Sequence, residues 1–254
     1  VRQHAIIRAR SEEHMLDIVE AFSYCALPDG DGIGIITQSG GAGVLMADRA
    51  EELGLRLPVL NAVTQTSLTV TIPAFGACGN PVDVTGQFVA NPALLRESVK
   101  IVMADPQVHI GIVWLQLMDA YIDTLITIFE EIKAQVAKPF IVCWVAASDK
   151  ALHALRSRGI AVLRGAEPAV DAVAALVRYA EARRMWAQDR DARARLQVPV
   201  IQMPPCAGPL ATLDAAKLLR ICGIRLAETR LAVDLAGTLD CADAIGYPVA
   251  LKIE

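Results

Sequence analysis

The sequence predicts an α/β fold whose main domain is a doubly wound, flavodoxin-like parallel sheet. Hydrophobic residues make up 54% of the chain and aromatic residues only 5%, so Ala, Val, Leu and Ile carry the apolar share. This mixture is typical of buried parallel strands and their covering helices, and it disfavours an all-β sandwich. Short apolar runs also alternate with segments of helical length, as they do in successive βαβ units.

Local signals support the individual elements of this domain. Ser11 is a good N-cap, with Glu12 and Glu13 in the first helical turn, and Asn91 precedes a proline that opens another helix. Gly54 stands where a C′ glycine is expected. In order, we expect strand 5–10, helix 12–26, strand 33–37, helix 42–53, strand 57–60, a stretch 65–72 leading to a loop at 79–86, helix 92–103, strand 110–117, helix 122–137, strand 139–146, helix 149–158, strand 160–163 and helix 167–184.

A second, smaller domain is expected after a linker. Residues 186–209 combine a charged segment with four prolines, which indicates an exposed connection. We therefore place the sheet domain at 27–185, the linker at 186–209 and the second domain at 210–254. The expected elements of the second domain are helix 212–219, strand 225–231, helix 235–245 and strand 247–253.

Composition narrows the classes of function. The net charge is −4, and acidic residues interrupt the basic run 178–195, so we expect no nucleic-acid partner. The apolar runs are far shorter than the roughly 20 residues that cross a bilayer, and no signal peptide opens the chain, so we expect no membrane contact. The six cysteines include no CxxC pair, and no histidine has a ligand-like spacing. We expect buried thiols, no metal site and a cytoplasmic protein.

The strongest candidate site is a glycine-rich turn, Ser39-Gly40-Gly41-Ala42-Gly43, between an expected strand and an expected helix. Unpaired N–H groups and the positive end of the helix meet there, and glycine lets a bulky anion approach the backbone. We therefore predict phosphate binding by these five residues. The spacing matches neither GxGxxG nor a P-loop, and the alternative is a tight turn that only permits close helix packing.

A second candidate is the loop Asn80-Pro81-Val82-Asp83-Val84-Thr85-Gly86. Asn80 and Asp83 can bind backbone N–H groups, while Thr85 and Gly86 leave a small polar surface that can line a cleft. The alternative is an Asx-type turn without a ligand.

A third candidate is Lys252, at the end of the apolar segment Gly246-Tyr247-Pro248-Val249-Ala250-Leu251-Lys252-Ile253. A cation on an apolar strand needs an anionic partner, and a nucleotide phosphate would supply one. The alternative is an edge-strand lysine that reaches solvent.

The three motifs in this order resemble the NDP-forming acyl-CoA synthetases, a superfamily that includes acetate–CoA ligase (ADP-forming) and is related to succinyl-CoA synthetase. The glycine-rich turn, with Asp48 in the following helix, is similar to the second succinyl-CoA-ligase-like domain, and residues 80–86 to the loop after it. Residues 213–253 resemble the opening of an ATP-grasp α+β domain. The resemblance covers essentially the whole chain and implies a fragment of a larger enzyme, in which residues 1–26 are the tail of a preceding domain and a connecting helix.

The resemblance implies an enzyme that interconverts acyl-CoA, ADP and phosphate with a carboxylic acid, CoA and ATP through a phosphohistidine. The helix that starts at Gly41 would be one of a pair whose N-termini hold the phosphohistidine, and Lys252 would contact nucleotide phosphates. The full-length protein would use ATP or ADP, CoA and Mg²⁺, with none certain for this chain. Its partners would be the CoA-binding and His-bearing domains, a carboxylic acid or acyl-CoA, and further copies in a homo-oligomer.

The chain departs from the family pattern because it lacks the catalytic His, which in the family lies upstream in a Ser-His-Thr-Gly context. No residue here is therefore expected to be catalytic, and the chain alone is expected to be inactive. An alternative is a ligand-binding regulatory module of a synthetase-like protein lysine acetyltransferase, and another is a flavodoxin-like binding module without chemistry. An upstream His would favour the synthetase.

Overall fold

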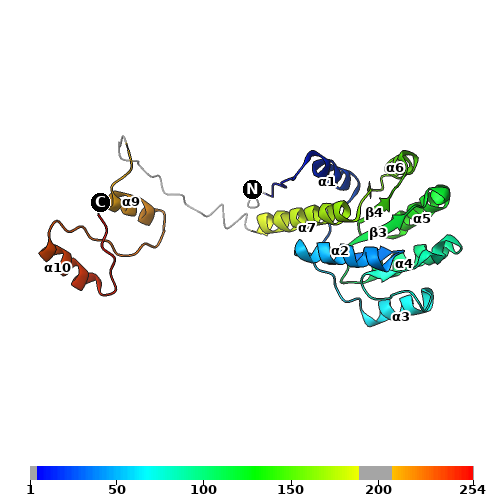
Figure 1. Cartoon of the computed structure of the whole chain (residues 1–254), viewed down its shortest axis with the longest axis horizontal. Helices are drawn as coiled ribbons and strands as arrows, with labels where there is room; N and C mark the ends of the chain where they lie inside the picture. The colour runs from blue at the N-terminus through cyan, green and yellow to red at the C-terminus, as the bar shows by residue number, and fades with distance from the viewer. Residues whose placement is uncertain (1–4, 189–207, 254) are drawn as a thin grey trace. The chain divides into compact units, whose positions relative to one another are not determined.

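The computed structural model describes residues 5–188 and 208–253, which belong to two separate compact units, 1–188 and 189–254 (Figure 1). The first unit carries a sheet between two layers of helices, and the described residues of the second form two helices. The elements of the first unit are α1 (Glu12–Tyr24), β1 (Ile33–Thr37), α2 (Gly40–Glu52), α3 (Ala62–Thr71), β2 (Val82–Asp83), η2 (Gly86–Val89), α4 (Pro92–Ala104), β3 (Ile110–Gln116), η3 (Asp119–Tyr121), α5 (Ile122–Gln135), β4 (Phe140–Val145), α6 (Asp149–Arg156), β5 (Val162–Leu163) and α7 (Ala166–Gln188).

The sheet confirms the predicted doubly wound topology. Its strand order is β2-β1-β3-β4-β5, and every pair is parallel. This is the flavodoxin-like order, in which the chain crosses to the other side of the sheet between β1 and β3. The point of reversal, at the carboxyl ends of these two strands, is where such sheets bind ligands.

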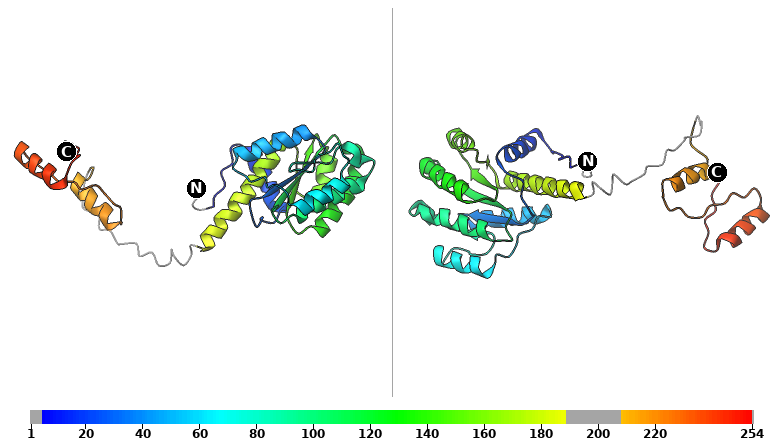
Figure 2. Two further views of the ribbon diagram at one scale, coloured as in Figure 1. Left: turned by 90° about the horizontal axis from the view of Figure 1, so that it is seen from below. Right: turned by 180° about the vertical axis from the view of Figure 1, so that it is seen from behind.

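Alternating side chains of the central strands belong to two apolar cores, one on each face of the sheet. In β3, Ile112 belongs to one core and Val113 to the other, and Ile141 and Val142 divide in the same way in β4. Helices α1, α2 and α7 cover the first core, and α3 to α6 cover the second. Figure 2 shows helices on both faces of the sheet. Burial on both faces explains why these strands are continuous apolar runs in the sequence.

Helix ends follow the predicted local chemistry in most cases. The Ser11 side chain accepts a hydrogen bond from His14 N at 3.2 Å, and Gly54 follows α2 with a φ of +69° that favours glycine. Asn91 precedes α4 as predicted, but its side chain makes no capping hydrogen bond.

Two predicted strands of the first unit are wrong. Residues 57–60 form no strand, because the edge of β1 is already occupied: the Asn80 side chain accepts from Ile35 N at 3.0 Å and donates to Ile33 O at 2.7 Å. The strand beside β1 is instead β2, inside the predicted loop 79–86, and α3 lies where only a connecting stretch was expected. Residues 5–10 form no strand either, since no strand of the sheet pairs with them.

The second unit contains α9 (Thr212–Ile221) and α10 (Leu235–Ile245). The predicted helices are confirmed, but the predicted strands 225–231 and 247–253 do not form in its described residues. Ala242 is the one buried residue among those that the structure describes in this unit. A strand needs a hydrogen-bonded neighbour, and the described residues of this unit provide none for either segment. The predicted ATP-grasp assignment stays a prediction, and most of the predicted linker, at 189–207, lies outside the described residues.

No helix of the described residues is long and apolar enough to cross a bilayer. The described residues also bring together no group of three or more His, Cys, Asp or Glu side chains that could hold a metal ion.

Candidate functional site

The glycine-rich turn lies at the carboxyl end of β1, at the point where the sheet reverses direction. Thr37, the last residue of β1, is buried and sets the shape of the turn. Its hydroxyl donates to Ser39 O at 2.9 Å and accepts from Ser39 N at 2.9 Å. The chain therefore enters α2 in a defined orientation.

The start of α2 is left open. Ser39 is the N-cap residue, but its side chain makes no capping hydrogen bond, and the first bond of the helix runs from Gly43 N to Ser39 O at 3.1 Å. No hydrogen bond within the described parts of the chain uses the N–H groups of Gly40, Gly41 and Ala42. Three donors and the positive end of the helix are thus available to an anion.

The glycines of this turn have different roles. A Cβ added to Gly41 would meet no atom within 4 Å, so no packing demands glycine there and the position is open to a ligand. At Gly43 a Cβ would lie 3.0 Å from Pro81 Cβ and 3.3 Å from Thr37 Cγ2. Gly43 is therefore needed for close packing, as the alternative interpretation of the turn expected. Gly41 is not needed for packing, which is consistent with the predicted phosphate site.

The loop 80–86 lies against this turn, which brings the first two predicted sites together. Pro81 packs beside Gly43, and Asp83 Oδ2 lies 3.4 Å from the position of a Cβ on Gly40. The Asn80 side chain is bound by the backbone of β1, so Asn80 supports the sheet instead of lining a cleft. Gly86 is exposed at the start of η2.

Asp83 and Thr85 form a compact polar turn at this edge. Asp83 Oδ1 accepts from Thr85 N at 2.8 Å, and Thr85 Oγ1 accepts from Gln87 N at 3.3 Å. The first bond is that of the predicted Asx-type turn, and the second is the equivalent bond of a Thr side chain. The second carboxylate oxygen of Asp83 remains on the side of α2, and it places a negative charge beside the open N–H groups.

Backbone strain gathers at the same edge of the sheet. Thr85, Leu117 and Ala146 have φ values of +62°, +55° and +57°, and they follow the carboxyl ends of β2, β3 and β4. A non-glycine residue in this region costs about 1–3 kcal/mol, and such residues concentrate at functional sites. The strained residues therefore lie at the same edge of the sheet as the glycine-rich turn, which supports a functional site at this edge.

Gln38 is a residue of this edge that sequence reasoning did not single out. Its Nε2 donates to Gln116 O at 3.2 Å, which joins the ends of β1 and β3. Its Oε1 is buried without a hydrogen-bond partner in the described residues. A buried acceptor without a donor is costly and marks a place where a ligand or another segment can donate.

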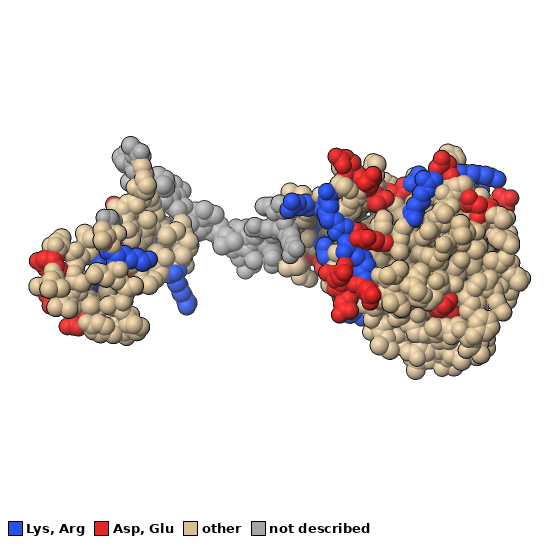
Figure 3. Space-filling view, viewed as in Figure 1, with Lys and Arg blue, Asp and Glu red and all other residues tan. Residues whose placement is uncertain are grey.

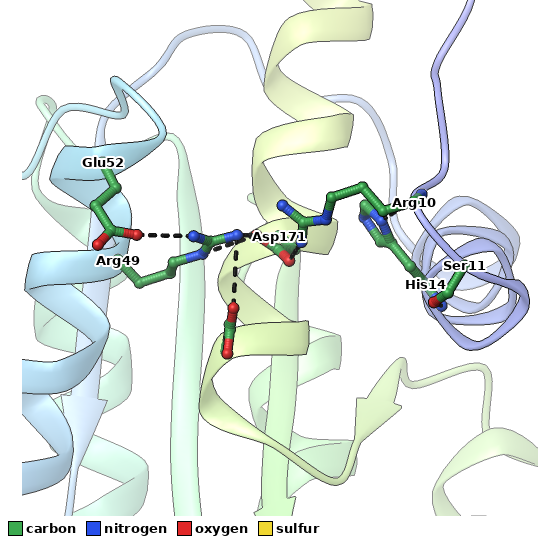
Figure 4. Close-up of polar contacts among 7 residues, drawn as sticks. Arg10, Ser11, His14, Arg49, Glu52 and Asp171 are labelled. Atoms are coloured by element: carbon green, nitrogen blue, oxygen red, sulfur yellow. Dashed lines mark hydrogen bonds and ion pairs between the residues drawn. The ribbon is translucent and has the colours of Figure 1, made fainter.

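The far end of α2 is anchored by buried charge (Figure 4). Asp171 on α7 has a side chain that is only 6% exposed, and its Oδ1 accepts from Arg49 Nε at 3.0 Å and from Arg49 Nη2 at 2.8 Å. Arg10 also pairs with Asp171, and Glu52 pairs with Arg49. The hydrogen bond from Arg49 to Glu52 is the largest cause that raises the pKa of Arg49 above its usual value. These contacts tie α2 to α7 and to the segment before α1.

Lys252 lies in the second unit and not in a strand. The residue is exposed, and the strand expected at 247–253 does not form in the described residues. Its contact with a nucleotide stays a prediction.

Comparisons with known proteins assign the sheet domain to a family. Residues 33–185 match the model of the Ligase-CoA domain. The chain is 28% identical to "Acetate--CoA ligase [ADP-forming] I" of Archaeoglobus fulgidus over 99% of its own length and 36% of the relative. It is 30% identical to "Acetate--CoA ligase [ADP-forming] I subunit alpha" of Pyrococcus furiosus over 71% of its length and 39% of the relative.

A solved structure shows the same architecture. The "dinucleotide forming Acetyl-coenzyme A synthetase 1" of Ca. Korarchaeum cryptofilum, in its apo form, superimposes with a TM-score of 0.64 and 25% identity, over 74% of this chain and 42% of that one. The chain spans well under half the length of the relatives it matches. Since the domain match covers more than half of its residues, the chain belongs to the Ligase-CoA domain family.

Proposed function

We propose that the chain is part of an ADP-forming acyl-CoA synthetase, and that the start of α2 holds a phosphoryl group during the reaction. The enzyme would interconvert acyl-CoA, ADP and phosphate with a carboxylic acid, CoA and ATP through a phosphohistidine carried by another domain. The observation that carries the proposal is the open helix end at the reversal point of the sheet, where Gly40, Gly41 and Ala42 present unused N–H groups.

The physical argument is electrostatic. A phosphoryl group carries close to two negative charges near neutral pH, and backbone N–H groups at a helix N-terminus bind it without reorganisation. Gly41 has no neighbour within 4 Å of an added Cβ, which leaves room for the group and for the histidine that carries it.

The carboxylate of Asp83 opposes the binding of an anion at this site. It lies close to Gly40 and repels a phosphoryl group unless a proton or a cation lies between them. The described residues bring together no group of three or more His, Cys, Asp or Glu side chains, so the predicted Mg²⁺ would take most of its ligands from the nucleotide phosphates and from water.

The second unit fits the same proposal. The match to the acetate–CoA ligase of Archaeoglobus fulgidus covers 99% of this chain, while the match to the subunit alpha of Pyrococcus furiosus covers 71%. We infer that the second unit begins the ATP-grasp segment, with Lys252 at the nucleotide. The CoA-binding and His-bearing domains and the acyl substrate remain the proposed partners.

Binding of inorganic phosphate to the chain tests the site directly. In an amide-resolved NMR titration, we expect the largest shifts at Gly40, Gly41 and Ala42. Gly41→Asp should abolish these shifts, because its carboxylate would occupy the open end and repel phosphate, while a negative charge there does not disfavour the helix. Gly41→Ala is the matched control and should retain binding, since a Cβ fits. Equal binding by the Asp and Ala variants would contradict the site.

Asp83→Asn should tighten the binding of phosphate about tenfold, because it removes the negative charge beside the open helix end.

Phosphorylation of the whole gene product tests the reaction. The open reading frame that encodes this chain, incubated with Mg²⁺ and γ-³²P-ATP, should form an acid-labile, base-stable phosphoprotein that CoA and a carboxylic acid discharge. Gly41→Asp should slow the labelling, and Gly41→Ala should not. Absence of labile label with every acid and nucleotide tried would refute the phosphohistidine route and favour the regulatory alternative.

A further inference from the structure

The surface of the first unit is hollowed by about 230 Å³ at the amino ends of β4 and β5, and we call this place the amino-edge hollow. It lies between the segments that follow α1 and α5, and Tyr24, Lys133, Lys138 and Gly159 are among the residues that line it. The volume is below the roughly 300 Å³ at which the sites of drug-sized ligands begin, so the hollow suits a small ligand. The helix end at Gly41 lies at the opposite edge of the sheet.

Much of the lining of the hollow is apolar. Tyr24, Val136, Phe140 and Ile160 contribute to it, and Tyr24 is 37% exposed. The apolar body of a ligand gains about 25 cal/mol for each Å² of its surface that such a lining removes from water.

Two lysines line the hollow, and each closes the end of a helix. Lys133 Nζ donates to Arg158 O at 2.8 Å and to Gly159 O at 2.6 Å, just after α6. Lys138 Nζ donates to Asp105 O at 2.6 Å, just after α4. Since an ammonium has three donors, these bonds leave one N–H of Lys133 and two N–H groups of Lys138 without a partner in the described residues.

The positive charge of these two lysines is not balanced within the described residues. Neither ammonium makes an ion pair with a carboxylate there, and the end of a helix supplies only about half a negative charge. Each lysine therefore keeps about half a positive charge, and a single carboxylate would neutralise both together. On the face of the first unit that Figure 3 shows, by contrast, many Lys and Arg side chains lie beside Asp or Glu.

Two carboxylates in the neighbourhood already have partners. Asp105 accepts from the N–H groups of Asn61 and Gln107, and Glu20 accepts from Arg156 Nε at 2.9 Å. Burial lowers the pKa of Lys138 below its usual value, although the charge of Asp105 opposes that shift. An ammonium that loses water without gaining a counter-ion is destabilised, and a bound anion would reverse this loss.

Gly159 brings a cation and an aromatic ring together at the hollow. A Cβ on Gly159 would lie 2.7 Å from Lys133 Nζ and 4.0 Å from Tyr24 Cδ1, so a ligand beside Gly159 meets a donor and an apolar surface at once. We propose that the amino-edge hollow binds a small carboxylate with a flat apolar body, whose charge pairs with Lys133 and Lys138 and whose body packs beside Tyr24. This site is independent of the proposed reaction.

An amide-resolved NMR titration of the full chain with sodium benzoate tests the site. Benzoate should give saturable shifts at the N–H groups of Tyr24, Lys138 and Gly159, with a dissociation constant of about 1 mM. Benzamide is the neutral control of the same shape and should bind at least about tenfold more weakly, because it lacks the charge. Benzoate shifts confined to residues 40–42 would instead assign the anion to the start of α2 and overturn the hollow, whatever phosphate does there.

Two variants test the charge and the space separately. Lys138→Met removes an ammonium but keeps an unbranched apolar side chain, and it should weaken benzoate binding at least about fivefold. Ala137→Trp leaves both lysines in place and fills the hollow with a large ring, because Ala137 is an exposed residue of the lining, and it should abolish the saturable shifts.

Lys150→Met is the matched control, since Lys150 is an exposed lysine on α6 that does not line the hollow, and it should bind benzoate as the wild type does. Circular dichroism should show that all three variants fold. Absence of saturable shifts in the wild type up to about 20 mM benzoate would overturn the proposal. Equal binding of benzamide, or full binding by Ala137→Trp, would overturn it as well.

Discussion

Helices α2 and α3 begin at opposite ends of the strands of the same sheet, and their first turns are built in opposite ways. At the start of α3, the Asn61 side chain accepts from Thr64 N at 2.8 Å, and Asp105 Oδ2 accepts from Asn61 N at 2.8 Å. At the start of α2, Ser39 makes no such bond and three N–H groups stay unused. The closed end of α3 satisfies its N–H groups within the fold, whereas the open end of α2 leaves three donors for the ligand that we propose.

Helix α2 is anchored near its other end by Asp171 and Arg49, and we expect the largest effect of a substitution there. Asp171→Ala removes the carboxylate that binds Arg49 and Arg10 and leaves both cations without their buried partner. We expect a loss of about 3 kcal/mol in the free energy of unfolding, measured by urea denaturation. Glu167→Gln is the control, since Glu167 is 67% exposed at 3.6 Å from Arg49, and it should change stability by less than about 0.5 kcal/mol.

The closed end of α3 should show a pH dependence of its own. Burial raises the pKa of Asp105, but the N–H groups of Asn61 and Gln107 hydrogen-bond its carboxylate and hold that pKa below its usual value. The stabilisation is therefore present above about pH 4, the ordinary range of an Asp, and is lost as pH falls through the lower folded pKa.

Asp105→Asn should reveal this directly. We expect the variant to be less stable than the wild type by about 1–2 kcal/mol at pH 6, and the difference to shrink as pH falls below 4. Urea unfolding at a series of pH values measures both. A difference that stays constant down to pH 2 would show that the carboxylate charge has no part in closing the helix.

Removing each N-cap compares the two helix starts most directly. Asn61→Ala should cost about 1 kcal/mol, because it frees Thr64 N, while Ser39→Ala should cost no more than about 0.5 kcal/mol, because Ser39 caps nothing. The same urea titrations serve for both. Equal losses would show that Ser39 closes α2 in solution and would weaken the open-end argument.

The smallest expected effect is a gain. Gly41→Ala fills open space in the first turn of α2 and should stabilise the unit by up to about 1 kcal/mol, whereas Gly43→Ala forces a Cβ against Pro81 and should destabilise it. Opposite signs in two neighbouring glycines would confirm that one is open to ligand and the other is packed. A loss at Gly41 would contradict that division.

Elements with a local signal were predictable from the sequence. The runs that became β1, β3 and β4 are apolar because they are buried on both faces, and Ser11 caps α1 through a bond to a residue three positions away. The glycine-rich turn was found because its strand, glycines and helix are adjacent in the chain. Periodicity and capping are local properties, so one sequence displays them.

Strand 57–60 failed because a residue distant in sequence competes for the same edge. Asn80 reaches back to Ile33 and Ile35, and no local pattern at 57–60 announces this. The strands expected in the second unit failed for the related reason that no neighbour among its described residues pairs with them. A β-strand forms only where a neighbouring strand pairs with it, and this pairing is set by the tertiary structure.

The sequence by itself thus determined the α/β class, the alternation of elements, the glycine-rich turn and the family resemblance. Only the tertiary structure decided that Pro81 and Asp83 lie against that turn, that Gly41 is open while Gly43 is packed, and that Asp171 on α7 anchors Arg49 on α2. The physical reason is the separation in sequence between the residues that interact. Helix caps and apolar periods act within a few residues, whereas the contacts that shape a site join residues far apart, and only the folded chain sets their distances.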